Sequence, residues 1–535
     1  MKNSPFDGPR SLAHSGAKNA PRMDLIVFED EHLLAANKPA GWNTHLPAPF
    51  AGEGLYEWLR QREPRWQGLS LLHRLDKETS GLIVFGKTAA ANRALARQFE
   101  EGRVLKEYLF LTDRPVAFRE LKARSALVRA GPKYVSRPLH AGAAVAETWF
   151  RPAGAMVEAR PLTGKTHQIR VQAAAGGFPI LGDTLYGGAP YPRLCLHAAH
   201  LQFEHPATGR TVSLSAPPDF AQEPRLALRR AVIDPAATNA FRLVHGAADG
   251  WPGLYLDQLG DYLLAQSAAP PTAAQRSQLE DWARRVAARA VYHKTLQREA
   301  RNAPALLWGA PAPGEISVRE NGVRFALRLD EGYSAGLFLD QRDNRRRFLT
   351  RYVAPGIEIP AGAQVLNTFA YTCGFSVCAA LGGARATSLD LSKNCLEWGR
   401  RNFLLNGLDP SGHDFIFGDV FGWLRRFVKK KRAFDVIVLD PPTFSRSRES
   451  GVFQAEKDYG ALAAAALPAL KPGGLLLAST NAAGFAPEDF LEAVTGAITR
   501  AGRRVLARPY APQPPDFPIE RAEPAYLKTV WMRVG

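Results

Sequence analysis

The sequence predicts a multidomain protein that combines α+β and α/β architecture. Its 535 residues are enough for roughly three or four domains of ordinary size. Residues 364–535 alternate apolar strands with helices, which is typical of a doubly wound parallel sheet. Segments rich in proline, residues 206–224 and 303–314, separate this region from the rest and are expected to be connections.

Composition and charge limit the kind of protein. With 46% hydrophobic and 22% charged residues, the chain is expected to be globular and soluble. A formal net charge of +17 favours a polyanionic partner, because clustered lysine and arginine bind phosphates by releasing counterions. A membrane surface would also attract such a charge, so charge alone does not name the partner.

The cysteines and the start of the chain indicate a compartment. Four cysteines, Cys195, Cys373, Cys378 and Cys395, are too few and too scattered for a disulfide framework or a zinc site, so no metal is expected. Residues 1–22 are expected to be a flexible basic tail without the apolar segment of a secretory signal. No apolar run approaches the roughly 18 residues that a membrane helix needs. We therefore expect a cytoplasmic protein.

The stretch of residues 71–87 contains the first candidate catalytic group. Asp76 stands between the cations Arg74 and Lys77 and is followed by a turn of small residues. The next residues, 82–85, form an apolar run that predicts a buried strand, which would hold the preceding loop rigidly. A carboxylate on a braced loop is suited to work on a substrate. Spacing alone nevertheless favours a simpler interpretation, in which Arg74 and Asp76 pair on a surface turn.

A resemblance favours the catalytic interpretation. The segment HRLDKETSGL, residues 73–82, resembles the motif of RluA/RluD-type RNA pseudouridine synthases, whose aspartate is catalytic. Four further blocks resemble the same family in the same order: NKPAG (37–41), RPLTGKTHQIRVQ (160–172), GGFPILGDTLYGG (176–188) and residues 193–209. The resemblance covers roughly residues 23–220 and implies a pseudouridine synthase domain with a mixed sheet.

The resemblance also implies roles for individual residues. Asp76 would be the nucleophile, Arg170 would pair with it and keep it ionised, and Tyr108 would stack on the uracil or move its proton. Arg74 would contact the RNA. Isomerising uridine changes no redox state and adds no group, so this domain is expected to need no cofactor, only a pocket for a flipped base. Two departures from the family pattern, Lys165 and Gln172, are expected to adjust RNA contacts.

The middle of the chain predicts a small accessory domain. Residues 237–266 resemble the small domain that precedes the catalytic domain in RlmI/RlmK-like rRNA methyltransferases, and residues 336–345, GLFLDQRDNR, resemble the segment that leads into that catalytic domain. We expect a small α+β domain that resembles an RNA-binding module over residues 225–312, with the final domain over 313–535.

Three strands of the last domain end in an aspartate: Asp390, Asp419 and Asp440. Ligands of doubly wound folds sit at the carboxyl ends of the strands, so these side chains are expected at a binding site. Asp390 lies 16 residues after Gly374, close to the roughly 20 expected of an acid that binds ribose. A nicotinamide dinucleotide site is the alternative, but the glycine turn lacks the GxGxxG pattern.

The segment LDPPTFSRS, residues 439–447, resembles the acceptor motif of Rossmann-like class I methyltransferases that act on nucleic-acid bases, which implies S-adenosylmethionine as cofactor. The resemblance assigns ribose to Asp390, adenine to Asp419 and the target base to Asp440. Asn367 stands where many relatives have aspartate, which weakens a charged contact there. The remaining implied contacts are the methionine end of the cofactor for Asn367, Phe369, Tyr371 and Gly374, and the target base for Pro441, Pro442 and Phe444.

The cysteine pattern bears on the methylated atom. Methylating C5 of cytosine needs a thiolate, yet no cysteine follows Cys395 in the sequence. The wording of the motifs is closer to the RlmK-like branch, so we expect a ring nitrogen of guanine as acceptor, which needs positioning rather than covalent activation. The basic run at residues 429–432 could track RNA phosphates or could be a solvated helix end.

These observations favour a bifunctional RNA-modifying enzyme acting on ribosomal RNA or on transfer RNA. The alternative is that the first domain only binds RNA and delivers it to an active methyltransferase. Retention of Asp76, Tyr108 and Arg170 together favours activity, because a binding module has no use for that set. A methyltransferase acting on protein or on a small molecule is a third interpretation, which the net charge disfavours.

Overall fold

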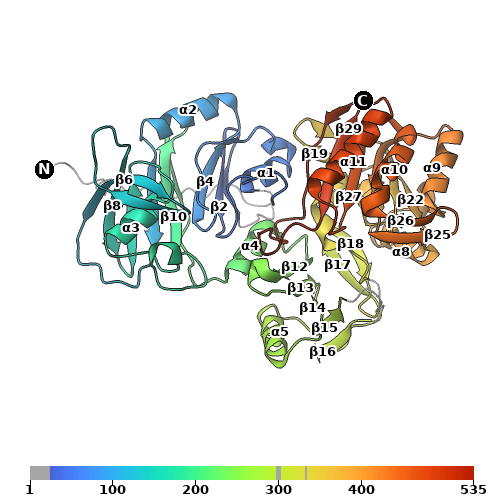
Figure 1. The fold of residues 1–535 in the computed structure, drawn as a ribbon, viewed down its shortest axis with the longest axis horizontal. Helices are drawn as coiled ribbons and strands as arrows, with labels where there is room; N and C mark the ends of the chain where they lie inside the picture. Colours follow the sequence, from blue (N-terminus) through green and yellow to red (C-terminus); the bar gives the residue numbers. More distant parts are fainter. Residues whose placement is uncertain (1–24, 53, 297–302, 332–333) are drawn as a thin grey trace. The chain divides into compact units, whose positions relative to one another are not determined.

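The computed structural model describes residues 25–52, 54–296, 303–331 and 334–535 (Figure 1). It divides into two units, each with its own core. The first comprises Met1–Pro47, Gly54–Arg60 and Arg65–Val232, and the second comprises Ala48–Glu53, Gln61–Pro64 and Ile233–Gly535. The second unit thus resumes at Ile233 instead of residue 225, and the expected tail at residues 1–22 lies outside the described residues.

The first unit is built on one large sheet. Its strands are β1 (Ile26–Glu29), β2 (Leu33–Lys38), β3 (Ser70–Leu71), β4 (Ser80–Gly86), β5 (Leu105–Phe110), β6 (Leu121–Ala130), β7 (Lys133–Arg137), β8 (Val145–Ala153), β9 (Met156–Pro161), β10 (Leu196–Glu204) and β11 (Thr211–Ser215). The order is β1-β2-β4-β10-β5-β9-β8-β6-β7, with β3 beside β4 and β11 beside β10. Strand β10 runs parallel to β4 and antiparallel to β5, so the expectation of a mixed sheet is confirmed.

The helices of this unit are α1 (Leu55–Arg60), α2 (Ala89–Glu100), α3 (Gln168–Ala175) and α4 (Pro224–Val232). Thr88 caps α2 by accepting a hydrogen bond from the amide of Ala91. Leu95 of α2 packs with Leu82 and Val84 of β4 in one core cluster, and Ile169 of α3 packs with Phe110 and Phe178 in another.

The expected linker at residues 206–224 is partly wrong. Residues Thr211–Ser215 form β11, which pairs in antiparallel register with β10. The alternation of the segment TVSLS explains the strand, because Leu214 points into the core cluster under α2 while its neighbours stay more exposed. The prolines on either side concealed this short period-two pattern.

The second unit opens with a five-stranded sheet in the order β12-β13-β14-β15-β16, accompanied by α5 and a hairpin of β17 and β18. Their bounds are β12 (Ala240–His245), β13 (Leu254–Leu259), β14 (Tyr262–Ser267), α5 (Ala273–Arg285), β15 (Ala290–Thr295), β16 (Ala305–Gly309), β17 (Ile316–Glu320) and β18 (Val323–Leu327). Leu264 of β14 and Phe325 of β18 share a core cluster with Phe348 and Trp531, so this sheet and the C-terminal part of the unit have a common core.

The rest of the second unit is a doubly wound sheet of seven strands. Its elements are α6 (Arg342–Thr350), β19 (Tyr352–Ala354), β20 (Ile357–Glu358), β21 (Gln364–Thr368), α7 (Gly374–Leu381), β22 (Arg385–Asp390), α8 (Lys393–Leu405), β23 (Asp414–Phe417), α9 (Val420–Lys429), β24 (Phe434–Leu439), β25 (Phe444–Ser447), β26 (Gly451–Gln454), α10 (Ala455–Ala466), β27 (Leu470–Thr480), α11 (Pro487–Arg500), β28 (Val505–Ala507) and β29 (Lys528–Val534). The strand order is β23-β22-β21-β24-β27-β29-β28, and only the pairs that involve β29 are antiparallel.

Alternate residues of the central strand β24 serve two cores. Val436 and Val438 belong to the cluster that includes residues of α7 and α8, whereas Ile437 and Leu439 belong to the cluster with α9, α10 and α11. A strand buried on both faces has to be apolar throughout, which is why this region is predictable from sequence. Among the described residues, no helix is both long and apolar enough to cross a membrane.

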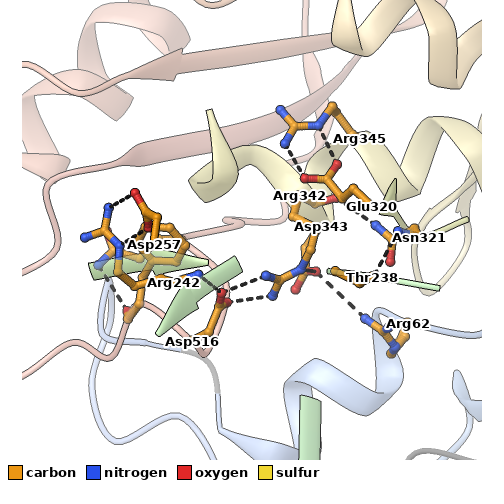
Figure 2. A network of polar contacts seen from close by, with 12 residues as sticks. Arg62, Thr238, Arg242, Asp257, Glu320, Asn321, Arg342, Asp343, Arg345 and Asp516 are labelled. Carbon is orange, nitrogen blue, oxygen red and sulfur yellow. Dashed lines mark hydrogen bonds and ion pairs between the residues drawn. The ribbon is translucent and has the colours of Figure 1, made fainter. Parts of the chain in front are cut away.

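Buried ion pairs fix the start of helix α6, which contains the last four residues of the GLFLDQRDNR motif (Figure 2). Arg342 donates to both carboxylate oxygens of Asp516 at 2.7 and 2.6 Å, and Arg345 donates to both oxygens of Glu320 at 2.7 and 2.6 Å. Asp516 also accepts from the backbone amide of Arg242 in β12 at 3.0 Å. This segment is therefore a structural joint between the five-stranded sheet and the seven-stranded sheet.

Candidate active sites

Lys38 of the NKPAG segment holds the loop that carries Asp76 in place. Lys38 is fully buried, and its ammonium donates to the carbonyls of Pro39, Trp42 and Lys77 at 2.8 to 3.0 Å. Burial lowers the pKa of Lys38 to about 7. Thr44 accepts from the amide of Leu75 and donates to its carbonyl, so the backbone on both sides of Asp76 is fixed.

Arg170 lies beside Asp76, but its main partner is a different carboxylate. Its Nε and Nη2 donate to Asp183 at 2.7 and 2.8 Å, while its Nη1 is 3.7 Å from Asp76 Oδ2. Asp183, from the GDTLYGG block, is buried, whereas 26% of the Asp76 side chain is exposed. Arg170 therefore connects an accessible carboxylate to a buried one, and sequence analysis missed Asp183 in this role.

His167 and Tyr186 complete this wall of the site. His167 adopts a left-handed backbone conformation with φ of 55°, and its Nε2 lies 3.9 Å from Asp76 Oδ2. Its Nδ1 is 2.8 Å from the hydroxyl of Tyr186, whose ring lies under the guanidinium of Arg170. A non-glycine residue in this conformation is frequent at functional sites, and no pattern in the sequence marks it.

Tyr108, Asp76, Arg170 and Arg74 line one cavity of about 690 Å³. Burial, together with the negative charge of Asp76, raises the pKa of Tyr108. The phenol is therefore protonated at neutral pH, which suits stacking or hydrogen bonding better than proton abstraction. Three chain segments far apart in sequence thus bring the predicted residues together, in a space large enough for a flipped nucleotide.

Two further residues of the synthase motifs are structural. His73 accepts from the amide of Val84 at 3.0 Å, and burial lowers its pKa to about 3, so its neutral ring fixes the start of the loop to β4. The expectation that Gln172 adjusts RNA contacts is wrong. Gln172 is buried and bonds to the hydroxyls of Thr148 and Ser125, so it fills an internal polar site.

In the second unit, residues 369–374 form an unusual turn between β21 and α7. Phe369, Tyr371 and Cys373 all have positive φ, at 52°, 48° and 62°. Alternating left-handed residues turn successive amides toward one side and make a concave site for an anion. At Gly374, a Cβ atom would come within 3.2 Å of the Arg345 side chain. The turn is therefore a candidate cradle for the methionine carboxylate of the expected cofactor.

Asp390 is fixed next to this turn. Its carboxylate accepts from the amides of Tyr371 and Ser392, both at 2.8 Å, and burial raises its pKa. Ser392 also caps α8 by accepting from the amide of Cys395. Asn367 is buried and donates to Ser376 at 3.0 Å, inside the contact between β21 and α7.

Asp419 lines a second cavity of about 340 Å³, together with Phe369 and the hairpin β25–β26. Its Oδ1 accepts from the amide of Gly422 at 2.9 Å, where it caps α9, and from the hydroxyl of Ser450 at 2.6 Å. Although burial opposes the effect, hydrogen bonds from Ser447 and Ser450 lower the pKa of Asp419. This cavity has the size and polarity for the adenosine end of a cofactor.

Asp440, directly after β24, is the acceptor candidate. Gln341 donates to it at 3.2 Å and to Ser479 of the neighbouring strand β27 at 2.7 Å. Burial, followed by the like charge of Asp340, raises the pKa of Asp440 to about 6. One carboxylate oxygen of Asp340, Oδ1, is buried and has no hydrogen-bond partner among the described residues. Sequence analysis did not predict this second carboxylate.

The remaining predicted side chains differ in position. Pro441 is buried beside Asp440, Pro442 is half-buried, and Phe444 is 56% exposed. Burial raises the pKa of the Cys373 thiol to about 12 and also raises the pKa of Cys378 and Cys395. Among the described residues, no cluster of histidine, cysteine and carboxylate side chains could hold a metal ion.

The folds and sites define two classes of protein in one chain. A seven-stranded sheet in this order, with acidic residues at or just after the carboxyl ends of β22, β23 and β24, is a class I methyltransferase fold, and its turn, Asp390 and Asp419 fit S-adenosylmethionine. The first unit combines a mixed sheet with an aspartate, a tyrosine and an arginine on one cavity, as in pseudouridine synthases.

Comparison with known families agrees with both classes. The model of the S-adenosylmethionine-dependent methyltransferase family matches residues 241–533, more than half of the chain, and that of RNA pseudouridylate synthases matches residues 32–175. The chain belongs to the S-adenosylmethionine-dependent methyltransferase family, and its N-terminal region is an RNA pseudouridylate synthase domain.

Individual relatives resemble the C-terminal part. The chain is 35% identical over 325 residues to a ribosomal RNA large subunit methyltransferase of Deinococcus radiodurans, covering 58% of this chain and 77% of the relative. It is 33% identical over 325 residues to the ribosomal RNA large subunit methyltransferase I of Aeromonas salmonicida, covering 59% and 78%. The solved structure of SMU.776, a putative methyltransferase complexed with SAH, is 31% identical, with a TM-score of 0.49, and covers 56% and 76%.

Proposed function

We propose that the protein is a bifunctional RNA-modifying enzyme. Its first unit isomerises uridine to pseudouridine, and its second unit methylates a base with S-adenosylmethionine. Ribosomal RNA is the proposed substrate, because the relatives of the second unit are named for it and because the net charge of +17 suits an RNA partner. Transfer RNA is the other candidate, and the proposed compartment is the cytoplasm.

The observation that carries the first activity is the convergence of Asp76, Tyr108 and Arg170 on one cavity. In this reaction the N1–C1′ bond breaks, the base rotates, C5 joins C1′, and the proton of C5 is lost while N1 gains one. Asp76 is accessible and braced, so it can serve as the nucleophile. The protonated Tyr108 holds the uracil. Arg170 orients the Asp76 carboxylate, because hydrogen bonds to Asp183 fix the position of its guanidinium.

For the second activity, the bound cofactor supplies an electrophilic methyl group. The turn at residues 369–374 and Asp390 would hold its methionine and ribose, and Asp419 its adenine. Asp440 would hold the amino or imino edge of a flipped base by hydrogen bonds. We propose that the part of the expected domain at 225–312 that lies in the second unit, from Ile233 onward, is an accessory domain, because Asp516 bonds to both β12 and α6 and thereby orders this region beside the acceptor site.

The proposed acceptor atom is a ring nitrogen of guanine. A C5 acceptor needs a thiolate, but Cys373 and Cys378 are buried with raised pKa values, and Cys395 lies in α8 on the cofactor side. A nitrogen lone pair needs only positioning, which Asp440 and Gln341 offer. Digesting methylated RNA to nucleosides and identifying the product by mass spectrometry tests this: 7-methylguanosine agrees, and 5-methylcytidine contradicts it.

The alternative proposal is that the first unit only delivers RNA to the methyltransferase. The buried ion pair of Arg170 and Asp183 beside an accessible Asp76 favours catalysis, because binding RNA needs no such pair. The experiment is to incubate purified full-length protein with unmodified ribosomal RNA and quantify pseudouridine. Formation of pseudouridine that requires Asp76 supports the bifunctional enzyme, and its absence supports the delivery module.

A further inference from the structure

The hairpin of β25 and β26 has two chemically different faces. It begins four residues after Asp440, at Phe444. In its antiparallel register Ser445 lies opposite Phe453, and Arg446 lies opposite Val452. Because side chains alternate between the faces of a strand, Ser445, Ser447 and Phe453 share one face, and Phe444, Arg446 and Val452 share the other.

The inner face of the hairpin, defined by Ser445, Ser447 and Phe453, belongs to the cofactor cavity. All three residues line the cavity that contains Asp419. Phe453 is only 6% exposed, and its ring lies 6.1 Å from that of Phe369 in the cofactor turn. Ser450, in the connection between the strands, donates to Asp419. The inner face therefore fixes the hairpin to the cofactor site.

The outer face, defined by Phe444, Arg446 and Val452, is mostly outside that cavity: Val452 borders it, whereas Phe444 and Arg446 do not line it. Phe444 is 56% exposed and Val452 is 45% exposed. Arg446 is exposed, and so is Arg448 in the connection; neither side chain has an ion pair or hydrogen bond in the part of the chain that the structure describes. Exposed charges do protect a sheet edge from aggregation, but an exposed phenylalanine beside them has the opposite effect. Together they are suited to a partner that offers both flat apolar surfaces and negative charge.

We propose that this outer face and Arg448 bind the RNA strand next to the methylated base. Phe444 stacks on a neighbouring base, while Arg446 and Arg448 contact flanking phosphates, which is how proteins commonly hold single-stranded RNA. The inference rests on the proposed RNA methyltransferase activity and extends it from the target base to its neighbours.

The position of the hairpin supports this assignment. Four residues of extended chain span at most about 14 Å, so Phe444 lies within reach of the nucleotides adjacent to a base held at Asp440. The exposure of Phe444 suits a stacked neighbour better than the enclosed target base that the motif implies. Single-stranded RNA also explains why an aromatic and two guanidinium groups occur on one ribbon, because each nucleotide offers a base face and a phosphate.

The test compares the double variant Arg446→Glu/Arg448→Glu with Arg500→Glu/Arg504→Glu in the full chain. The control makes the same charge change at two exposed arginines, one at the end of α11 and one four residues beyond it. Helix α11 follows the carboxyl end of β27, and its 14 residues extend about 21 Å away from that edge of the sheet. An unmodified transcript of large-subunit ribosomal RNA is the probe. Methylation kinetics at several salt concentrations, and SAH affinity by calorimetry, are measured.

The hairpin double variant is expected to raise the KM for RNA by at least tenfold. The slope of RNA affinity against salt concentration should fall by the contribution of about two phosphates, and SAH affinity should stay unchanged within twofold. Phe444→Ala is expected to raise KM without changing the salt dependence, and the control to change KM by less than twofold. Equal effects in the hairpin and control variants would overturn the inference, and so would a loss of SAH affinity that accounts for the rise in KM. Wild-type protein that binds SAH but methylates no RNA would instead refute the proposed function itself.

Discussion

Asp76 and Asp440 are the central carboxylates of the two units, and their surroundings are opposite. Asp76 keeps 26% of its side chain exposed, lies in a wide cavity and has the cation Arg170 at 3.7 Å. Asp440 is half-buried, has the like charge of Asp340 nearby and accepts a hydrogen bond from the neutral Gln341. The difference in neighbouring charge matches the proposed chemistry, because a cation favours the ionised form that a nucleophile needs, whereas a group that holds a base edge acts through positioned hydrogen bonds.

The largest expected effect comes from removing the exposed carboxylate. Asp76→Asn should lower pseudouridine formation by at least about 10⁴-fold, since no other group nearby can replace a nucleophile. Methylation should be unchanged within twofold, because the cofactor turn and Asp440 belong to the other unit. Both modifications are quantified on one RNA by nucleoside mass spectrometry. Full pseudouridylation by this variant would show that Asp76 is not the nucleophile.

Removing the carboxylate of the second unit should separate the activities in the other direction. Asp440→Ala is expected to lower methyl transfer by about 10²- to 10³-fold, through loss of the groups that hold the acceptor base. Affinity for SAH should survive, because the turn at residues 369–374, Asp390 and Asp419 provide that binding. Calorimetry with SAH and the methylation assay are run on the same preparation. A parallel loss of SAH affinity would place Asp440 in cofactor binding instead.

The contact between Arg170 and Asp183 can be weakened without touching Asp76. Asp183→Asn removes the charge that holds the guanidinium at 2.7 and 2.8 Å, so Arg170 should lose its orientation and pseudouridine formation should fall by about 10²-fold. Methylation by the same preparation controls for misfolding of the chain, and circular dichroism monitors the first unit. An unchanged rate would mean that Arg170 needs no support from Asp183.

The two sites should respond differently to pH. Since the pKa of Asp440 is raised to about 6, its ionised form is lost as the pH falls through that value, and methyl transfer should drop about tenfold per unit below it. Asp340→Asn removes a like charge, so the acid limb should move to lower pH. Pseudouridine formation, measured in the same reactions, provides the control and should show no displacement in this variant. If the acid limb of the methylation profile does not move in this variant, Asp340 does not raise the pKa of Asp440.

The smallest effect is expected from the cysteines. Cys373→Ser and Cys378→Ser should retain methylation within about twofold, because both thiols are buried with raised pKa values and serve packing. The methylation rate of each variant is compared with wild type at saturating cofactor. Loss of activity in either variant, together with 5-methylcytidine as product, would contradict the proposed nitrogen acceptor.

Local sequence patterns predicted those features of the fold that depend on neighbouring residues. Strand β24, which ends just before Asp440, is apolar on both faces and was therefore predictable from its continuous apolar run. Partners brought together from distant segments were not predictable in the same way. The link between Arg170 and Asp183 spans 13 residues and a turn, and the contact between Lys38 and Lys77 spans 39, so neither leaves a periodic signal.

The strand β11 and the hairpin β25–β26 show a second limit. Both are short and are flanked or filled by proline, serine or arginine, which are typical of loops, so their two-residue period was concealed. Their pairing partners decide their conformation: β11 lies beside β10, and the inner face of the hairpin is held by Phe369 and Asp419. Tertiary contacts therefore override local propensity at these positions.

Omitting the cofactor shows whether one chain contains two independent active sites. Full-length wild-type protein is incubated with unmodified ribosomal RNA, with and without S-adenosylmethionine, and both modified nucleosides are quantified. We expect the same yield of pseudouridine in both reactions and a methylated base only when the cofactor is present. No pseudouridine in either reaction, or a yield that collapses without the cofactor, would contradict the account.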